Sequence, residues 1–266
     1  MAYYKNPITR YFLRKGYLRK ISYRLSYYYR VLSKDLLTDF TILLSKRDVK
    51  VIIDAGANIG FMTFQFRKRF SQADVYCFEP NPNVFNVLVN NYKGDSRVHC
   101  FPYGVGDADR EQAFNINANT GTSSFLDAAD YHRSHQAINL LGSHVVQMIS
   151  LDEFVKKNSI DRIDILKLDI EGYELMALQG AKSLLKDQKI DVIYTEVNIV
   201  GSYVGQVLFH DITGYLKEYG YHLFNLEGFV AQETPIRQAI LGNAVYFSEN
   251  FREYLENQFG RENCGW

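Results

Sequence analysis

The sequence predicts an α/β fold built on a mostly parallel sheet, because three short apolar runs each end in a carboxylate and lead towards a helical pattern. The first run, 51–53, ends in Asp54 and a glycine-containing turn. The second run ends in Glu79, and the third ends in Asp169. Strands that are apolar on both faces are typical of the buried centre of a parallel sheet. The carboxyl ends of such strands form the edge at which ligands bind in open α/β sheets.

The composition is that of a globular domain without bulk charge. The chain has 266 residues, of which 47 % are hydrophobic and 23 % charged, and this length suits one α/β domain with modest additions. The formal net charge is zero, so we do not expect nucleic acid as a partner. Cys77, Cys100 and Cys264 form neither a disulfide framework nor a metal-binding pattern, which indicates a reducing, cytoplasmic setting. We find no apolar run long enough to cross a bilayer and no signal-peptide pattern.

The N-terminal part, 1–48, is predicted to be a basic, tyrosine-rich helical extension ahead of a second domain over 49–266. No acidic residue precedes Asp35, and apolar residues recur at three-four spacing over 18–32, which predicts an amphipathic helix. Such a helix packs on the second domain with a solvated basic back, or it makes a peripheral contact with an anionic membrane. An RNA-binding arm is a less favoured alternative. A second helix is expected over 35–44.

The turn after the first strand contains Asp54, Gly56, Asn58 and Gly60. A nicotinamide or flavin site requires G-x-G-x-x-G, and Asn58 stands where the second glycine should be. The pattern Asp-x-Gly-x-x-x-Gly instead resembles motif I of class I S-adenosylmethionine-dependent methyltransferases. Glycines let the backbone turn sharply and approach a ligand closely. We expect these four residues to bind that cofactor, with Asn58 at its carboxylate or in the lining of the turn; a structural turn without a ligand is the alternative.

Glu79 ends the second strand, about 20 residues or slightly more after the glycine turn. An acid at this position is placed to accept hydrogen bonds from both hydroxyls of a ribose, and it would repel a phosphorylated ribose. Adenosyl cofactors present those hydroxyls, which agrees with S-adenosylmethionine. A solvated strand end is the alternative for Glu79.

The next elements lead into a loop that carries another candidate. A helix is predicted over 81–92, entered through Asn81 as its cap and Pro82 at its first position. A strand is expected over 97–103, and Asp107 follows it in a glycine-containing loop. Asp107 is placed to meet the adenine amino group, and a turn aspartate is an equal alternative.

The middle of the chain is predicted to form an insertion near the substrate. Two extended segments, 111–117 and 121–126, flank a turn, and Ser123 in the second segment is a candidate contact for cofactor or acceptor. The polar, irregular stretch 127–142 is expected to form a flap. Two histidines in this flap are interpreted as solvated loop residues rather than metal ligands.

The second half of the chain continues the alternation of strands and helices. We expect, in order, an extended run over 145–149, a short helix opened by a Ser150–Glu153 capping box, a strand that ends in Asp169, a helix over 173–185, a strand over 191–195, a helix over 207–219, and strands over 221–225 and 244–247. The last two strands are expected to form the antiparallel edge of a mixed sheet.

Five ordered motifs carry a resemblance to a known family: DAGANIG at 54–60, FEPNP at 78–82, GTSS at 121–124, SLDEF at 150–154 and LKLDIEGYE at 166–174. Together they resemble the FkbM family of S-adenosylmethionine-dependent methyltransferases, over roughly residues 50 to 200 with a compatible tail to about 248. The resemblance implies the class I methyltransferase fold, a Rossmann-like mixed sheet of seven strands with helices on both faces. It also implies O-methylation of a hydroxyl on a glycan, glycolipid or secondary metabolite.

Methyl transfer is an in-line displacement, so the enzyme must align an acceptor oxygen with the methyl group and remove the hydroxyl proton. Asp169 is expected to act as the general base, with Glu171 beside it as a second catalytic candidate. Alternatively, Asp169, Glu196 and Asn198 form an oxygen-ligand set for Mg²⁺. That set lies where catechol O-methyltransferase, a more distant relative in fold, has its metal ligands. Strand-end caps and surface acids are the structural alternative. Lys167 alternates with buried neighbours, so its head either reaches a rim or pairs with an acid, for which Glu196 is a candidate.

Two other functions stay open from the sequence. One is a methyltransferase that acts on RNA or on protein nitrogen, although the Asn/Asp-Pro-Pro-Tyr motif typical of amino-group methyltransferases is absent. The other is a non-catalytic binding module that keeps the cofactor fold as a scaffold. The acids and glycines at the predicted cofactor turn argue against the module, because a scaffold would not need them.

Overall fold

The computed structural model describes residues 43–44, 47–129, 138–231, 238–264 and 266. The predicted amphipathic N-terminal helix lies outside these residues, as do the flap histidines His132 and His135. The boundary between an extension over 1–48 and a domain over 49–266 therefore stays a prediction. Among the described residues, no helix combines the length and apolarity needed to span a membrane.

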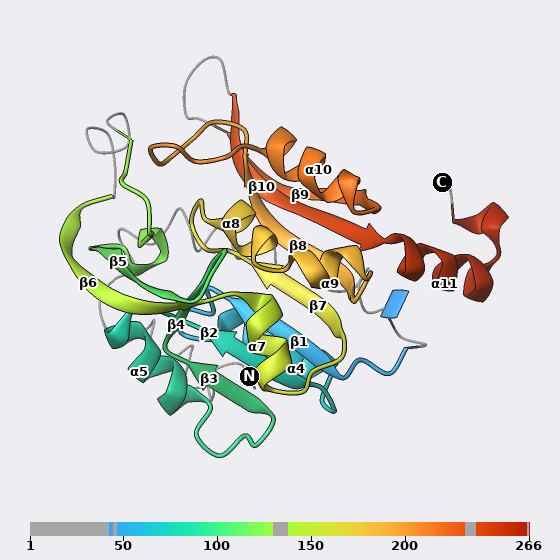
Figure 1. Ribbon diagram of the computed structural model, residues 1–266, viewed down its shortest axis with the longest axis horizontal. Helices are drawn as coiled ribbons and strands as arrows, with labels where there is room; N and C mark the ends of the chain where they lie inside the picture. The colour runs from blue at the N-terminus through green and yellow to red at the C-terminus, as the bar shows by residue number, and fades with distance from the viewer. Residues whose placement is uncertain (1–42, 45–46, 130–137, 232–237, 265) are drawn as a thin grey trace, which may run out of the picture.

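A seven-stranded mixed sheet forms the centre of the molecule, with the strand order β3-β2-β1-β7-β8-β10-β9 (Figure 1). Its strands, in that order, are Val98–Phe101, Asp74–Phe78, Val51–Ala55, Ile163–Leu168, Ile190–Asn198, Ala239–Ser248 and Tyr221–Ala231. The first five run parallel to one another, and β10 pairs antiparallel with both β8 and β9. The predicted mixed sheet and its antiparallel edge are confirmed, and β7 pairs directly with β1.

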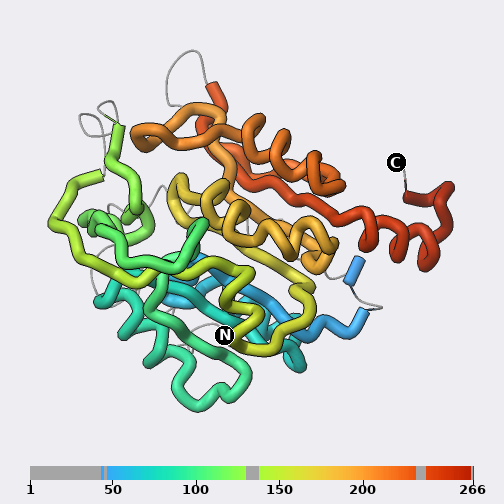
Figure 2. Tube along the Cα trace, in the orientation of Figure 1, coloured from blue at the N-terminus to red at the C-terminus, as the bar shows by residue number. Residues whose placement is uncertain are grey.

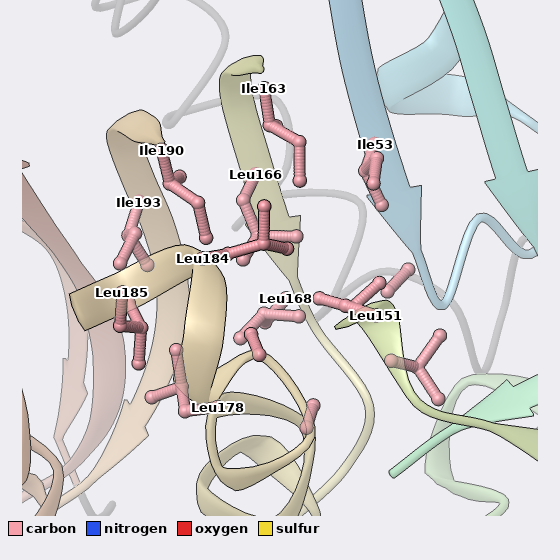
Figure 3. Packing of buried hydrophobic residues seen from close by; sticks show 14 of the residues in the cluster. Ile53, Leu151, Ile163, Leu166, Leu168, Leu178, Leu184, Leu185, Ile190 and Ile193 are labelled. Atoms are coloured by element: carbon pink, nitrogen blue, oxygen red, sulfur yellow. The ribbon is translucent and has the colours of Figure 1, made fainter. Parts of the chain in front are cut away.

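Helices cover both faces of the sheet because alternate strand residues point to opposite sides. On one face, Ile53, Leu166 and Ile193 pack against α7 to α10 (Figure 3). On the other face, Ile52 and Ile165 pack against α4, α5 and α11. The helices on the first face are α7 (Leu151–Lys157), α8 (Glu174–Gln179), α9 (Lys182–Lys186) and α10 (Phe209–Glu218), and those on the second are α4 (Phe61–Arg69), α5 (Pro82–Asn91) and α11 (Glu249–Phe259). Helix α11 had no counterpart among the predicted elements.

A second sheet of three strands, in the order β4-β6-β5, was not foreseen. It consists of β4 (Tyr103–Val105), β5 (Arg110–Asn117) and β6 (Leu140–Ile149). The predicted strand 97–103 is wrong as a single element, because it divides at Pro102, which has no N–H to donate to a ladder. In Figure 2 this small sheet, in green, lies at one end of the molecule and α11, in red, lies at the other.

Two further segments differ from the prediction: 121–126 in the insertion, and the helix expected over 173–185. The segment 121–126 is not a strand: it contains the 3₁₀ helix η3 (Thr120–Thr122) and a single bridge between Asn115 and Ser124. The helix predicted over 173–185 is divided into α8 and α9 at Gly180. A Cβ at Gly180 would collide with the backbone oxygen of Gly106, so the division lies where the small sheet packs against this helix.

The predicted helix caps are present. The side chain of Asn81 accepts a hydrogen bond from Asn83 N at 3.1 Å and starts α5 with Pro82 in its first turn. Ser150 Oγ accepts a hydrogen bond from Glu153 N at 3.4 Å and starts α7. In a complete capping box the Glu153 side chain would also accept a hydrogen bond from Ser150 N. Here Ser150 N donates instead to Asp109 Oδ1, at 2.9 Å.

Candidate cofactor and acceptor site

The carboxyl ends of β1, β2, β7 and β8 lie at one edge of the large sheet, because these four strands are parallel neighbours. This arrangement brings together the acids that end these strands, Asp54, Glu79, Asp169 and Glu196. Residues separated by more than 100 positions in the chain thus share one site. We name the part of this edge at β1 and β2 the cofactor side and the part at β7 and β8 the acceptor side, after the roles predicted from the sequence.

The turn after β1 requires residues that tolerate the left-handed region. Gly56, Asn58 and Gly60 have φ angles of 72°, 51° and 89°, and asparagine is among the few other residues that adopt this region readily. A Cβ at Gly56 would collide with the backbone oxygen of Asp169. A Cβ at Gly60 would collide with the ring of Tyr92. Gly56 therefore lets the turn lie directly against the end of β7, and Gly60 lets it pack against Tyr92 at the end of α5.

Asp54 lies beneath this turn and is fully buried. Its Oδ2 accepts a hydrogen bond from Thr63 Oγ1 on α4 at 2.7 Å, and its Oδ1 lies 3.1 Å from Lys167 Nζ. Both carboxylate oxygens thus have partners from the chain itself. Asp54 consequently supports the turn from below, and its predicted contact with the cofactor stays a prediction.

Lys167 is a buried lysine whose partners differ from the expected one. Its Nζ pairs with Asp54 and lies 3.6 Å from Asp169 Oδ2, so the lysine pairs with acids, one of the two predicted alternatives, but with these aspartates rather than the candidate Glu196. It also donates hydrogen bonds to the backbone oxygens of Ala55 and Gly56, at 3.1 and 2.9 Å. Burial disfavours the charged ammonium and lowers the pKa of Lys167. The attraction of the Asp54 and Asp169 carboxylates outweighs this effect, so the pKa of Lys167 is raised overall.

Glu79 lies beside the turn, as predicted. Its Oε2 accepts a hydrogen bond from Asn58 N at 2.9 Å, and its Oε1 accepts one from Asn81 N at 2.8 Å. Burial raises its pKa to about 7, against the opposing effect of these two backbone donors. A carboxylate oxygen can accept more than one hydrogen bond, so Glu79 retains the capacity to bind ribose hydroxyls.

The acceptor side contains three carboxylates. One oxygen each from Asp169, Glu171 and Glu196 lies within 4.8 Å of the others. The structure therefore adds Glu171 to the predicted metal pair of Asp169 and Glu196. Asn198, the third predicted ligand, follows Glu196 by two residues on β8, so both side chains leave the same face of the sheet. Its buried Oδ1 has no hydrogen-bond partner among the described residues.

Glu171 is held in an unusual conformation by its neighbours. It has φ 55°, in the left-handed region. Glu174 Oε1 accepts hydrogen bonds from the backbone N–H groups on either side, Ile170 at 3.0 Å and Gly172 at 3.2 Å. Burial raises the pKa of Glu174 to about 7. Ser124 Oγ donates to the backbone oxygen of Glu171 at 2.7 Å, which joins the insertion to this loop.

Tyr203 is a site residue that the sequence analysis missed. Its buried hydroxyl lies 2.9 Å from Glu171 Oε2 and 2.9 Å from the backbone oxygen of Thr122. No local pattern marks this tyrosine, since it reaches Glu171 only because the loop after β8 folds back on the insertion. The bridge between Tyr203 and Ala128 is part of the same contact.

Two predicted cofactor contacts have partners within the small sheet and the insertion. Ser123 Oγ accepts a hydrogen bond from Asn117 N at 3.1 Å. Asp107 pairs with Arg110 at 2.8 Å, and this arginine lowers the pKa of Asp107. These partners show how both side chains are held. The predicted roles of Ser123 and Asp107 at the cofactor stay predictions.

Comparison with known proteins gives one family match. The family model described as the methyltransferase FkbM domain matches residues 54–223, which include the cofactor turn, the insertion and the acceptor-side acids.

Three curated relatives are similar over about half of the chain or slightly more. "Methyltransferase 1" of Beauveria bassiana is 29 % identical over 159 residues, 55 % of this chain and 62 % of that protein. "Hexuronic acid methyltransferase AglP" of Haloferax volcanii is 27 % identical over 149 residues, 56 % of each. "2-O-methyltransferase NoeI" of Sinorhizobium fredii is 27 % identical over 172 residues, 62 % of this chain and 70 % of that protein. The match thus spans less than two thirds of the first two relatives.

Proposed function

This chain belongs to the methyltransferase FkbM domain family, and on that premise we propose that it transfers the methyl group of S-adenosylmethionine to a hydroxyl of a glycan, glycolipid or secondary metabolite. The observation that carries the proposal is the contact between the cofactor turn and the end of β7, where Gly56 packs against the backbone of Asp169. A methyl donor bound on the turn would lie next to a carboxylate that is 27 % exposed. The names of two relatives, a 2-O-methyltransferase and a hexuronic acid methyltransferase, support a sugar hydroxyl as the acceptor.

In the proposed chemistry, one carboxylate accepts the proton of the acceptor hydroxyl. The acceptor oxygen forms a bond to the methyl carbon while the bond from that carbon to sulfur breaks, and the electron pair stays on sulfur. Asp169 takes the hydroxyl proton, a contribution of about 10²–10⁴-fold in rate for a positioned base. Glu171 is oriented by Tyr203 at 2.9 Å and forms the wall of the acceptor site beside the base.

A second candidate feature is a divalent cation on the acceptor side. The three clustered carboxylates and the buried Oδ1 of Asn198 are hard oxygen donors, which Mg²⁺ prefers. Asp169, Glu171 and Glu196 would hold the ion, with Asn198 close to the set. A bound Mg²⁺ would acidify the acceptor hydroxyl. Turnover that is unchanged in EDTA, and unchanged by added Mg²⁺, would contradict this part of the proposal.

The test of the cofactor site is calorimetric titration with S-adenosylhomocysteine. We expect wild type to bind and Glu79→Ala to bind at least about tenfold more weakly, a loss of about 1.4 kcal/mol. Folded wild type that does not bind would overturn the proposal and favour a non-catalytic module. With binding established, turnover on a panel of hydroxylated glycans tests the acceptor; N-methylated RNA or protein as the product would favour the alternative enzyme.

We also propose a cytoplasmic enzyme whose N-terminal extension contacts anionic membranes. The basic, tyrosine-rich composition before Asp35 supports this contact, since such segments bind anionic lipid surfaces. Flotation with anionic liposomes compares the full chain with one that lacks residues 1–33. We expect only the full chain to float, and equal flotation of both chains would contradict the proposed membrane contact.

A further inference from the structure

Lys167 contacts more groups than it would need if it served only as the counter-ion of Asp54. An ammonium group carries three protons, and three acceptors lie within hydrogen-bond distance of Nζ: Asp54 Oδ1 at 3.1 Å and the backbone oxygens of Ala55 at 3.1 Å and Gly56 at 2.9 Å. Neutralising the buried carboxylate would require only the first of these. The other two contacts go to the backbone of the cofactor turn.

The two carbonyls lie where the parallel ladder of β1 ends. Ala55 O also accepts a hydrogen bond from Asp169 N at 3.3 Å, so the ammonium and the backbone of Asp169 share one acceptor. The carboxylate of Asp169 lies 3.6 Å from the same ammonium. A single buried side chain is therefore in contact with the start of the cofactor turn and with the residue that faces the acceptor.

We propose that Lys167 is a positioning residue that fixes the cofactor turn relative to Asp169, and thus sets where the methyl donor lies with respect to the base. The inference rests on the proposed function, because the turn matters in this way only if it holds the methyl donor. The side chains of Lys167 and Asp54 are 3 % and 0 % exposed, so water cannot replace the lost donors when the lysine is removed. Gly56 O then has to move to find another donor, whereas Ala55 O keeps only its hydrogen bond from Asp169 N.

A double-mutant cycle separates positioning from charge neutralisation. The variants are Lys167→Met, Asp54→Asn and the double variant, each measured for thermal unfolding and for affinity towards S-adenosylhomocysteine. Lys167→Met alone leaves a buried carboxylate without its cation, so its unfolding temperature falls most. The double variant restores the charge balance and recovers much of that stability. Because Gly56 O still lacks its donor and Ala55 O still lacks the ammonium, we expect the double variant to bind at least about tenfold more weakly than wild type and than Asp54→Asn.

Two further variants serve as controls. Thr63→Val removes the hydrogen bond of 2.7 Å to Asp54 Oδ2 without touching the turn, so it is expected to lower the unfolding temperature while changing affinity by less than about threefold. Lys189→Met removes an exposed lysine paired with Asp161 at 2.6 Å, and both readouts should match wild type.

The outcomes distinguish this inference from the proposed function. Affinity that recovers together with stability in the double variant would show that Lys167 only neutralises Asp54, and would overturn the inference. A folded Lys167→Met protein that binds like wild type would do the same. Wild type that fails to bind S-adenosylhomocysteine would instead remove the proposed function, and with it the premise of the inference.

Discussion

The carboxylate of Glu79 accepts a hydrogen bond of 2.9 Å from the backbone N–H of Asn58, so the end of β2 is joined directly to the turn after β1. The second oxygen accepts a hydrogen bond from Asn81 N, at the start of α5. One buried acid thus connects the cofactor turn, the end of a strand and the start of a helix. Its protonation state is expected to affect both the stability of the fold and the affinity for the cofactor.

The unfolding free energy of the ligand-free protein is expected to fall as pH rises from about 4.5 to about 7. Glu79 has a pKa raised from 4.5 to about 7 by burial, so in this window the folded chain keeps a proton that the unfolded chain has lost. Each pKa unit is worth about 1.4 kcal/mol. Urea unfolding across this range measures the slope, and Glu79→Gln should reduce it.

Part of that slope should remain in Glu79→Gln, because burial also raises the pKa of Glu174 to about 7. The double variant with Glu174→Gln should be nearly flat. Stability of wild type that rises steadily from pH 4.5 to 7 would contradict the assignment. The affinity for S-adenosylhomocysteine should change in the opposite direction and strengthen as pH rises through about 7, since the ionised carboxylate accepts ribose hydroxyls better.

Gly56→Ala is expected to destabilise the protein strongly and to abolish measurable cofactor binding. The new methyl group would meet the backbone oxygen of Asp169, and φ at this position is 72°. Gly94→Ala is the matched control, since Gly94 has φ 96° but nothing within 4 Å of an added Cβ. The control carries only the backbone strain of about 1–2 kcal/mol. Urea unfolding and ligand titration compare the two, and equal losses would show that the contact with Asp169 is unimportant.

Tyr203→Phe is expected to loosen the insertion on the acceptor side. The change removes one buried hydroxyl near Glu171 and Thr122 and should cost about 1–2 kcal/mol. Amide hydrogen exchange over 119–129 should become faster. Tyr221→Phe removes a comparable buried hydrogen bond, to Ile190 O at 2.9 Å, far from the insertion in the fold. This control should lose similar stability without faster exchange over 119–129; unchanged exchange in Tyr203→Phe as well would contradict the coupling.

Millimolar Mg²⁺ is expected to raise the unfolding temperature of wild type, because a ligand that binds only the folded state stabilises it. Glu196→Gln should abolish the rise, since it removes one of the three clustered carboxylates. Glu153→Gln, on the exposed side of α7, is the control and should respond like wild type. An identical shift in all three proteins would indicate non-specific ion binding.

Local sequence patterns were sufficient for much of the fold. The apolar runs that end in Asp54, Glu79 and Asp169 became β1, β2 and β7, side by side and parallel. The five motifs led to the FkbM resemblance, and the family match over 54–223 confirms it. These features are local because a strand, a turn and a cap each depend on residues within a few positions of one another.

The errors in the fold arose where a distant segment changed a local preference. Pro102 divides a run that otherwise resembles one strand, and β4 then pairs with β6, more than 40 residues further along the chain. The helical pattern over 173–185 divides at Gly180, where the backbone oxygen of Gly106 lies in the space that a Cβ would need. Neither contact can be inferred from the periodicity of the segment itself.

The same distinction holds at the site. The sequence by itself determined which acids and glycines end the strands, and hence at which edge a cofactor is expected, because strand ends follow from local pattern. Only the tertiary structure decided that Lys167 pairs with Asp54 across 113 positions, and that Tyr203 meets Glu171 across 32. Such partners depend on which strands become neighbours and how the loops fold back. Those are properties of the packed chain, since a buried charge or hydroxyl takes whichever partner packing brings within reach.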